Sequence, residues 1–112
     1  MLRTPSDFAA LSAAPGVTTP LLGVRHRTVA ATESTPSLRL GIATSRKVGN
    51  AVVRNRIRRR LKSIARELAP EVRPGAEILI GVRAAASTAS SADLRAALTE
   101  CLRRARLVEV SA

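Results

Sequence analysis

Aromatic residues are almost absent from this chain of 112 residues, in which Phe8 is the only one. A core must therefore be packed from Val, Ile, Leu and Ala. Cys101 is the single cysteine, so an internal disulfide is excluded, which fits a reducing compartment. No apolar run approaches the ~20 residues that cross a bilayer, and no apolar signal-peptide segment follows Met1. The sequence predicts a soluble, cytoplasmic protein without a membrane partner.

Carboxylates are also scarce. The chain has 8 Asp or Glu against 19 Lys or Arg, which gives a net charge of +11. Residues 46–66 contain nine Lys or Arg and no carboxylate. Such a balance in a small chain indicates a polyanionic partner, either nucleic acid or an acidic membrane surface. Because a membrane-surface helix carries bulky or aromatic residues on its apolar face, and this segment has no aromatic residue, the sequence favours nucleic acid.

The length is that of one domain, and we expect residues 1–112 to fold as a single unit. Periodicity and turn residues predict the order helix-strand-strand-helix-strand-helix. The predicted ranges are 4–13, 21–31, 38–44, 50–68, 76–82 and, after a cap at Ser90, about 91–106. The fold class is α/β, as an α+β sandwich of a small sheet packed by helices. The strands at 38–44 and 76–82 flank a helix and should share the sheet, through a connection that is normally right-handed.

The helix predicted at 50–68 has two chemically different sides. Its apolar stripe consists of Val53, Ile57, Leu61, Ile64 and Leu68, spaced by three or four residues. The other side is basic, with Asn55 in its middle. Like charges four residues apart destabilise a helix by a few tenths of a kcal/mol, roughly, so a bound anion would relieve this face. Guanidinium groups bind phosphate bidentately, and Asn can hydrogen-bond a 2′-OH or a base edge.

The segment that opens this helix is more specific than its charge. Residues 46–61 read RKVGNAVVRNRIRRRL, in which Gly49 permits a positive φ and Asn50 can cap the helix. This segment closely resembles the signature of the bacterial ribonuclease P protein component, which has a basic residue, Gly-Asn-Ala-Val, Arg-Asn-Arg, then Ile with further basic residues. The resemblance extends over the chain, from an N-terminal helix with Asp-Phe to a strand reading ILIGVR and a final helix.

The resemblance implies the protein subunit of a ribonucleoprotein endonuclease that removes the 5′ leader from precursor tRNA. It implies that the RNA subunit with Mg²⁺ carries the chemistry, that one protein binds each RNA, and that no protein side chain is catalytic. It also implies a left-handed crossover through the helix at 50–68. The predicted RNA-binding residues are Arg46, Lys47, Asn50, Arg54, Asn55, Arg56, Arg58, Arg59, Arg60 and Lys62.

The chain departs from the family in its aromatic residues, which usually line a cleft that binds the leader. Phe8 matches the first of them, but the next two positions fall at Ser12 and near Val24. Bases of single strands stack on aromatic rings at about 1–3 kcal/mol each. We therefore expect weaker or differently built leader binding, with Phe8 either the retained platform or a core residue.

Other chemistry has little support in the sequence. His26 lies between two arginines and is interpreted as an RNA contact or a bystander, while Cys101 falls on the apolar side of the last helix. No carboxylates lie close enough in sequence to suggest a metal site held by the protein. The alternative function is a basic RNA-binding protein, ribosomal or chaperone-like, without a part in catalysis. A helix-turn-helix DNA-binding protein is disfavoured because a strand precedes the basic helix.

Overall fold

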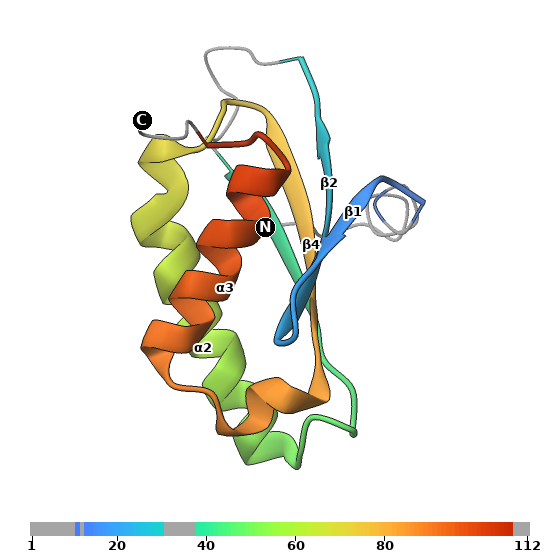
Figure 1. The fold of residues 1–112 in the computed structure, drawn as a ribbon, viewed down its shortest axis with the longest axis vertical. Helices are drawn as coiled ribbons and strands as arrows, with labels where there is room; N and C mark the ends of the chain where they lie inside the picture. The colour runs from blue at the N-terminus through green and yellow to red at the C-terminus, as the bar shows by residue number, and fades with distance from the viewer. Residues whose placement is uncertain (1–10, 12, 31–37, 109–112) are drawn as a thin grey trace.

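The computed structural model describes residues 11, 13–30 and 38–108, and two helices cover one side of a four-stranded sheet (Figure 1). The strands and α-helices are β1 (Gly16–Thr18), β2 (Leu22–Thr28), β3 (Leu38–Ala43), α2 (Ala51–Leu68), β4 (Ala76–Val82) and α3 (Ser91–Arg104). Short 3-10 helices follow α2 and β4, at Ala69–Glu71 and Ala84–Thr88. The predicted α+β class is confirmed. The predicted first helix, at 4–13, lies outside the described residues except for Leu11, which is helical and buried, and Ala13, which lies in a turn.

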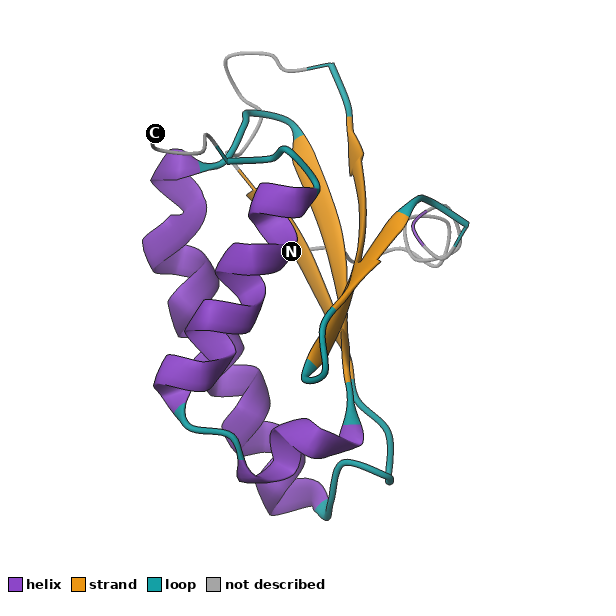
Figure 2. Ribbon diagram, in the orientation of Figure 1, coloured by secondary structure: helices purple, strands orange, loops and turns teal. Residues whose placement is uncertain are grey.

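The sheet has the strand order β1-β2-β4-β3. β3 and β4 are parallel, as predicted for strands that flank a helix, whereas β2 runs antiparallel to both β1 and β4. The register places Val24 opposite Ile80, and Leu40 opposite Ile78. The chain therefore crosses from β3 to β4 through α2, which lies beside α3 on the same side of the sheet (Figure 2).

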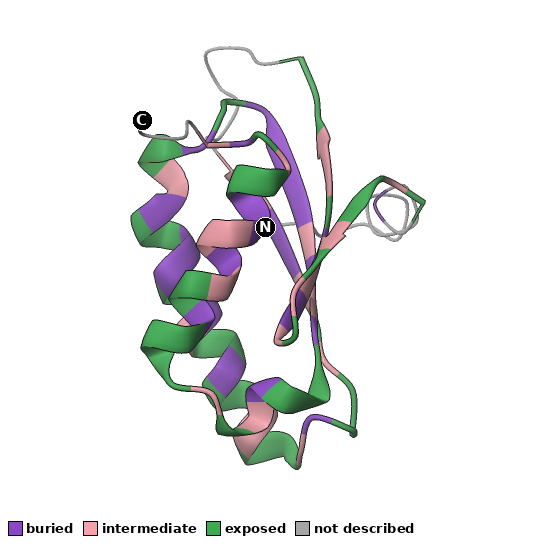
Figure 3. Cartoon of the chain, in the orientation of Figure 1, coloured by how far each residue is buried: buried purple, intermediate pink, exposed green. Residues whose placement is uncertain are grey.

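The core lies between this side of the sheet and the two helices. Alternate residues of β4, from Ala76 to Val82, are buried against the helices, as the two-residue period of a strand requires. On α2 the buried positions recur at helical spacing, so one stripe faces inward and the rest of the helix is exposed (Figure 3). Ile57, Leu61, Ile64 and Leu68 of the predicted stripe are buried, and Val53 is half-buried.

Helix α3 confirms two further predictions. Ser90 caps it through a reciprocal pair of hydrogen bonds with Asp93, the predicted capping box. Cys101 is fully buried in the core on the inner side of this helix. Burial is the main cause that raises the pKa of its thiol, so the thiolate is disfavoured and the residue serves packing.

Four details of the prediction were wrong. The short strand β1 was missed, because three residues between Pro15 and Pro20 carry no readable alternation; pairing with β2 is what makes them a strand. The strand predicted at 21–31 ends at Thr28, and the segment between β4 and α3, for which no helix was predicted, contains a 3-10 helix. The last helix ends at Arg104 instead of 106, because Arg106 adopts a φ of 59°.

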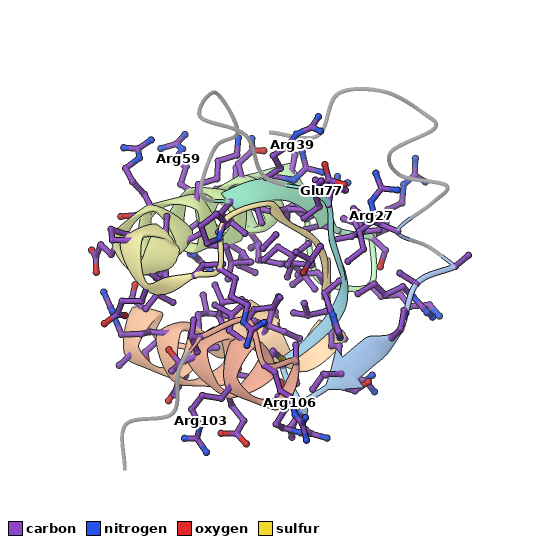
Figure 4. The ribbon with its side chains drawn as sticks, turned by 90° about the horizontal axis from the view of Figure 1, so that it is seen from above. Arg27, Arg39, Arg59, Glu77, Arg103 and Arg106 are labelled. Carbon is purple, nitrogen blue, oxygen red and sulfur yellow. The ribbon has the colours of Figure 1, made fainter. Side chains whose placement is uncertain are left out.

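A buried carboxylate connects three strands of the sheet. Glu77 lies on β4 opposite Arg27 of β2 and Arg39 of β3, and only 1% of it is exposed. One carboxylate oxygen accepts from Arg27 Nε at 2.5 Å and the other from Arg39 at 2.7 Å. Figure 4 shows the three side chains together, away from α3. The sequence analysis did not identify this network, which holds the register of β2, β4 and β3.

Replacing Glu77 with Gln should lower the free energy of unfolding by about 1–3 kcal/mol, because the buried hydrogen bonds would lose their charged acceptor. Urea denaturation followed by circular dichroism measures the change. The control is Glu100→Gln, which removes an exposed i,i+3 pair with Arg103 and should change stability by less than about 0.5 kcal/mol. Equal effects of the two variants would contradict a special role for Glu77.

Candidate nucleic-acid interface

The turn before helix α2 contains a glycine that no other residue can readily replace. Gly49 has a φ of 150°, and a Cβ placed on it would lie 3.0 Å from Cβ and Cγ1 of Val53. The next residue caps the helix, as Asn50 Oδ1 accepts a hydrogen bond from the Val53 N–H at 3.0 Å. Both sequence predictions for this turn are confirmed. The carboxamide oxygen of Asn50 is thus used by the cap, which leaves its NH₂ group as the donor for a partner.

The residues predicted to bind RNA lie on α2 and on the turn before it. Arg46 and Lys47 are exposed in that turn, and Asn50 follows at the cap. Along the helix, the exposed members are Asn55, Arg56, Arg58, Arg59 and Lys62. Arg54 and Arg60 are half-buried beside the apolar stripe. We call these ten residues the α2 surface. No carboxylate lies in the first turn of α2, so the cations there have no local anion along the helix.

Three arginines of the α2 surface are anchored to loops on both sides of the helix. Arg56 and Arg60 donate to the backbone carbonyls of Ser87 and Ala89, at 3.5 and 3.2 Å. Arg58 donates to Thr44 Oγ1 at 3.2 Å. Each guanidinium has five N–H donors, so each keeps several for a partner. Anchoring orders these long side chains in advance, which lowers the entropy lost when an anion binds.

Arg54 differs from these three. Its Nε is buried, and within the described part of the chain it has no hydrogen-bond acceptor. A buried N–H without an acceptor destabilises a protein by about 1–3 kcal/mol. Because this atom is buried, the donors that Arg54 can offer to a ligand are those at the end of its half-buried guanidinium group.

A hollow lies on the sheet, on the side away from α2 and α3. It encloses about 200 Å³ and is lined by residues of β1, β2 and β4, with Ala43 of β3: Gly16, Val17, Thr18, Gly23, Val24, Arg25, Leu79 and Gly81. The sequence analysis placed a missing aromatic near Val24, but Val24 packs in the core. By strand alternation its neighbours Gly23 and Arg25 face the hollow, which the buried Val24 also helps to line. Phe8 and Ser12 lie outside the described residues.

The sequence predicts no metal site held by the protein and no membrane-spanning helix, and His26 is the only histidine. In the ranges 13–30 and 38–108, and at Leu11, no three His, Cys, Asp or Glu side chains gather where they could hold a metal ion. In the same part of the chain, no helix is both long and apolar enough to cross a membrane. His26 lies half-buried on β2.

Gly49→Ala should destabilise the protein by about 1–3 kcal/mol, since the new Cβ would combine a strained φ with contacts to Val53. Thermal denaturation measures the loss. Gly23→Ala is the matched control, because a Cβ there would meet no atom within 4 Å. If Gly49→Ala melted at the temperature of the wild type, the turn would not need glycine.

The sequence and the fold of this chain are similar to those of known proteins. The family described as Ribonuclease P matches residues 1–106. The ribonuclease P protein component of Mycobacterium sp. (strain KMS) is 43% identical over 75 residues, which cover 66% of this chain and 64% of that protein. The component of Lactiplantibacillus plantarum is 35% identical over 74 residues, covering 66% and 65%.

The chain thus spans slightly less than two thirds of the length of these two relatives. The RNase P protein of Staphylococcus aureus has the same fold, with a TM-score of 0.80, 22% identity and 96% of both chains covered. The family match extends over nearly the whole chain and includes the glycine turn and the α2 surface. The chain belongs to the ribonuclease P protein family.

Proposed function

We propose that this chain is the protein subunit of ribonuclease P, and that it assists a catalytic RNA in the endonucleolytic removal of the 5′ leader from precursor tRNA. The observation that carries the proposal is the α2 surface, which presents pre-ordered arginines around Asn55 and no carboxylate in its first turn. A phosphate backbone is the ligand that such a surface fits.

The proposed role of the α2 surface is to hold the RNA subunit. Arg56, Arg58 and Arg60 keep donors for phosphate oxygens after their anchoring bonds, and Asn55 is exposed between the arginines, where its amide can reach a 2′-OH or a base edge. Arg54 is half-buried, and its terminal guanidinium nitrogens are the donors proposed to reach a phosphate, since its Nε is buried. These residues bind and orient RNA, and none of them is assigned a proton transfer.

Mg²⁺ is proposed to act while bound mainly by the RNA, where it would supply the charge that a phosphodiester cleavage requires. The donor set of the described residues does not fit a site held by the protein alone. Its one buried carboxylate, Glu77, is neutralised by two arginines, and no three-ligand cluster accompanies it. No step of the reaction is therefore derived from protein-bound metal.

The hollow on the sheet is the proposed place for the leader. Its floor of glycine and alanine lets a strand approach the backbone closely, and Arg25 at its edge supplies positive charge. Arg25 is itself steadied by a hydrogen bond to the Ala14 carbonyl at 2.9 Å. No aromatic residue lines this hollow in the described residues, so stacking there would depend on Phe8. We infer one protein per RNA subunit, acting in the cytoplasm.

The test is cleavage of precursor tRNA by a bacterial ribonuclease P RNA at low Mg²⁺ and near-physiological salt. The wild-type protein should restore cleavage at the 5′ end of the mature tRNA. Arg54→Ala and Arg56→Ala should each weaken RNA binding by about 1–3 kcal/mol. The slope of log affinity against log salt concentration reflects the number of phosphate contacts. The double variant should reduce this slope by the amount expected for about two lost contacts, while its Tm stays near that of the wild type.

Arg95→Ala serves as the matched control, because it removes one exposed arginine of α3 that is not among the ten residues of the α2 surface and whose partner is Glu67, near the C-terminal end of α2. It should cleave and bind like the wild type. Binding without any stimulation of cleavage would favour a plain RNA-binding protein. A double variant that melts early but binds normally would show that these arginines serve folding.

A further inference from the structure

The end of α3 has the hydrogen bonds of a Schellman motif. The Leu107 N–H donates to the Leu102 carbonyl at 2.9 Å, and the Arg106 N–H donates to the Arg103 carbonyl at 3.0 Å. Leu102 and Leu107 are both buried, so the apolar contact that accompanies this motif is present. Arg106 occupies the position just after the helix, and its φ is 59°.

Arginine is an unfavourable choice at this position. A left-handed backbone strains any residue with a Cβ, and glycine is the usual occupant. Arg106 is the only residue other than glycine with a positive φ among the described residues. Cations near a helix C-terminus do favour the macrodipole, but Arg103 and Arg104 already supply them in the last turn. The helix dipole therefore does not explain why a third cation, Arg106, is kept in a strained backbone conformation.

Arg106 belongs to a group of exposed arginines. Arg103 and Arg104 precede it, and Arg73 lies beside it because its N–H donates to the Leu107 carbonyl at 2.8 Å. Arg104 is anchored to the Thr18 carbonyl at 3.0 Å. Within 11–108 as described, the carboxylate paired with this group is Glu100, 3.4 Å from Arg103. We call Arg73, Arg103, Arg104 and Arg106 the α3-end cluster.

The α3-end cluster lies on the opposite side of the molecule from the α2 surface. In Figure 4, Arg59 projects from α2 on one side, and Arg103 and Arg106 project from the end of α3 on the other. The molecule measures 22 Å along its shortest axis. A single rigid phosphate backbone lying along α2 cannot also contact this cluster, so the cluster is available to a different segment.

We propose that the α3-end cluster binds the phosphate backbone of a second RNA segment, so that the protein bridges two segments. The proposal rests on the proposed function, because an RNA on the α2 surface is what brings a second segment near. The α3-end cluster supplies what a phosphate backbone needs, namely several guanidinium groups with one of them anchored. An arginine that is kept in a strained conformation fits a binding role, since strain of this kind is tolerated where a side chain has a use.

The decisive variant is Arg106→Gly, because folding and binding should change in opposite directions. Removing the strain should raise Tm by about 2–5 °C. Losing one phosphate contact should weaken RNA binding about 3- to 10-fold and reduce the salt slope by about one contact. Arg106→Lys keeps both the charge and the strain and should bind nearly like the wild type. Arg106→Asn tolerates the left-handed backbone without a charge and should bind like Arg106→Gly.

Two binding measurements distinguish the sources of the second segment. One uses the protein with ribonuclease P RNA alone, and the other uses precursor tRNA with the assembled holoenzyme. A loss in the first assigns the cluster to the RNA subunit, and a loss only in the second assigns it to the substrate. Arg95→Gln, which removes one exposed charge elsewhere on α3, should leave both affinities unchanged.

If Arg106→Gly raises Tm but leaves both affinities and both salt slopes unchanged, the α3-end cluster is not an RNA contact, and the proposal is overturned. That failure is separate from a failure of the proposed function. In the same assay, an Arg54→Ala/Arg56→Ala variant that binds ribonuclease P RNA normally would overturn the function itself.

Discussion

The burial of the apolar stripe of α2 against the sheet is the interaction on which the other features depend. Ile57, Leu61, Ile64 and Leu68 are buried on one side of the helix. Burying one such side chain fully contributes about 1.5–3 kcal/mol, whereas a repelling pair of like charges four residues apart costs only a few tenths, roughly. Packing therefore outweighs repulsion, and the helix forms although five cations and a single carboxylate, Glu67, are exposed on its outer side. The fold holds the charges together, and a polyanion is what relieves them.

The sheet fixes where that cationic side begins and which way it faces. β3 and β4 are parallel, so α2 must start close to the end of β3 and return the chain to the start of β4. Gly49 makes the sharp turn, and Asn50 sets the first residue of the helix. On the other side of the sheet, Glu77 ties Arg27 and Arg39 into register across β2, β4 and β3. The side of the sheet that faces the helices thus forms the core, and the opposite side forms the hollow.

The sequence predicted those features whose cause is local. The stripe of α2, the cap at Asn50, the positive φ of Gly49 and the capping box at Ser90 all depend on residues within one or two turns of each other. The half-burial of Arg54 was also readable, since Arg54 adjoins the stripe on a helical projection. Glu77 is the one charged residue within the apolar strand 76–82, which indicates a buried carboxylate that needs cationic partners.

Features that depend on distant partners could not be predicted in the same way. β1 is a strand because it pairs with β2, and Arg27 and Arg39 meet Glu77 from 50 and 38 residues away. The anchoring of Arg56 and Arg60 on the loop before α3 likewise joins segments about 30 residues apart. The left-handed backbone of Arg106 follows from the end of α3, whose position the periodicity gave only to within two residues.

Net charge and anchored charge contribute differently to recognition. A charge of +11 attracts any polyanion over about a Debye length, without regard to sequence or shape. Orientation must come from groups whose positions the fold determines. Arg56, Arg58 and Arg60 are held by the segments that follow β3 and β4, and Arg104 is held by β1, so the spacing of their guanidinium groups is set before a partner binds. A flexible basic tail of equal charge would bind a polyanion with similar salt dependence but could not select the geometry of that partner. The folded placement of the arginines, more than their number, is what can make a basic protein a subunit with a defined position in a ribonucleoprotein.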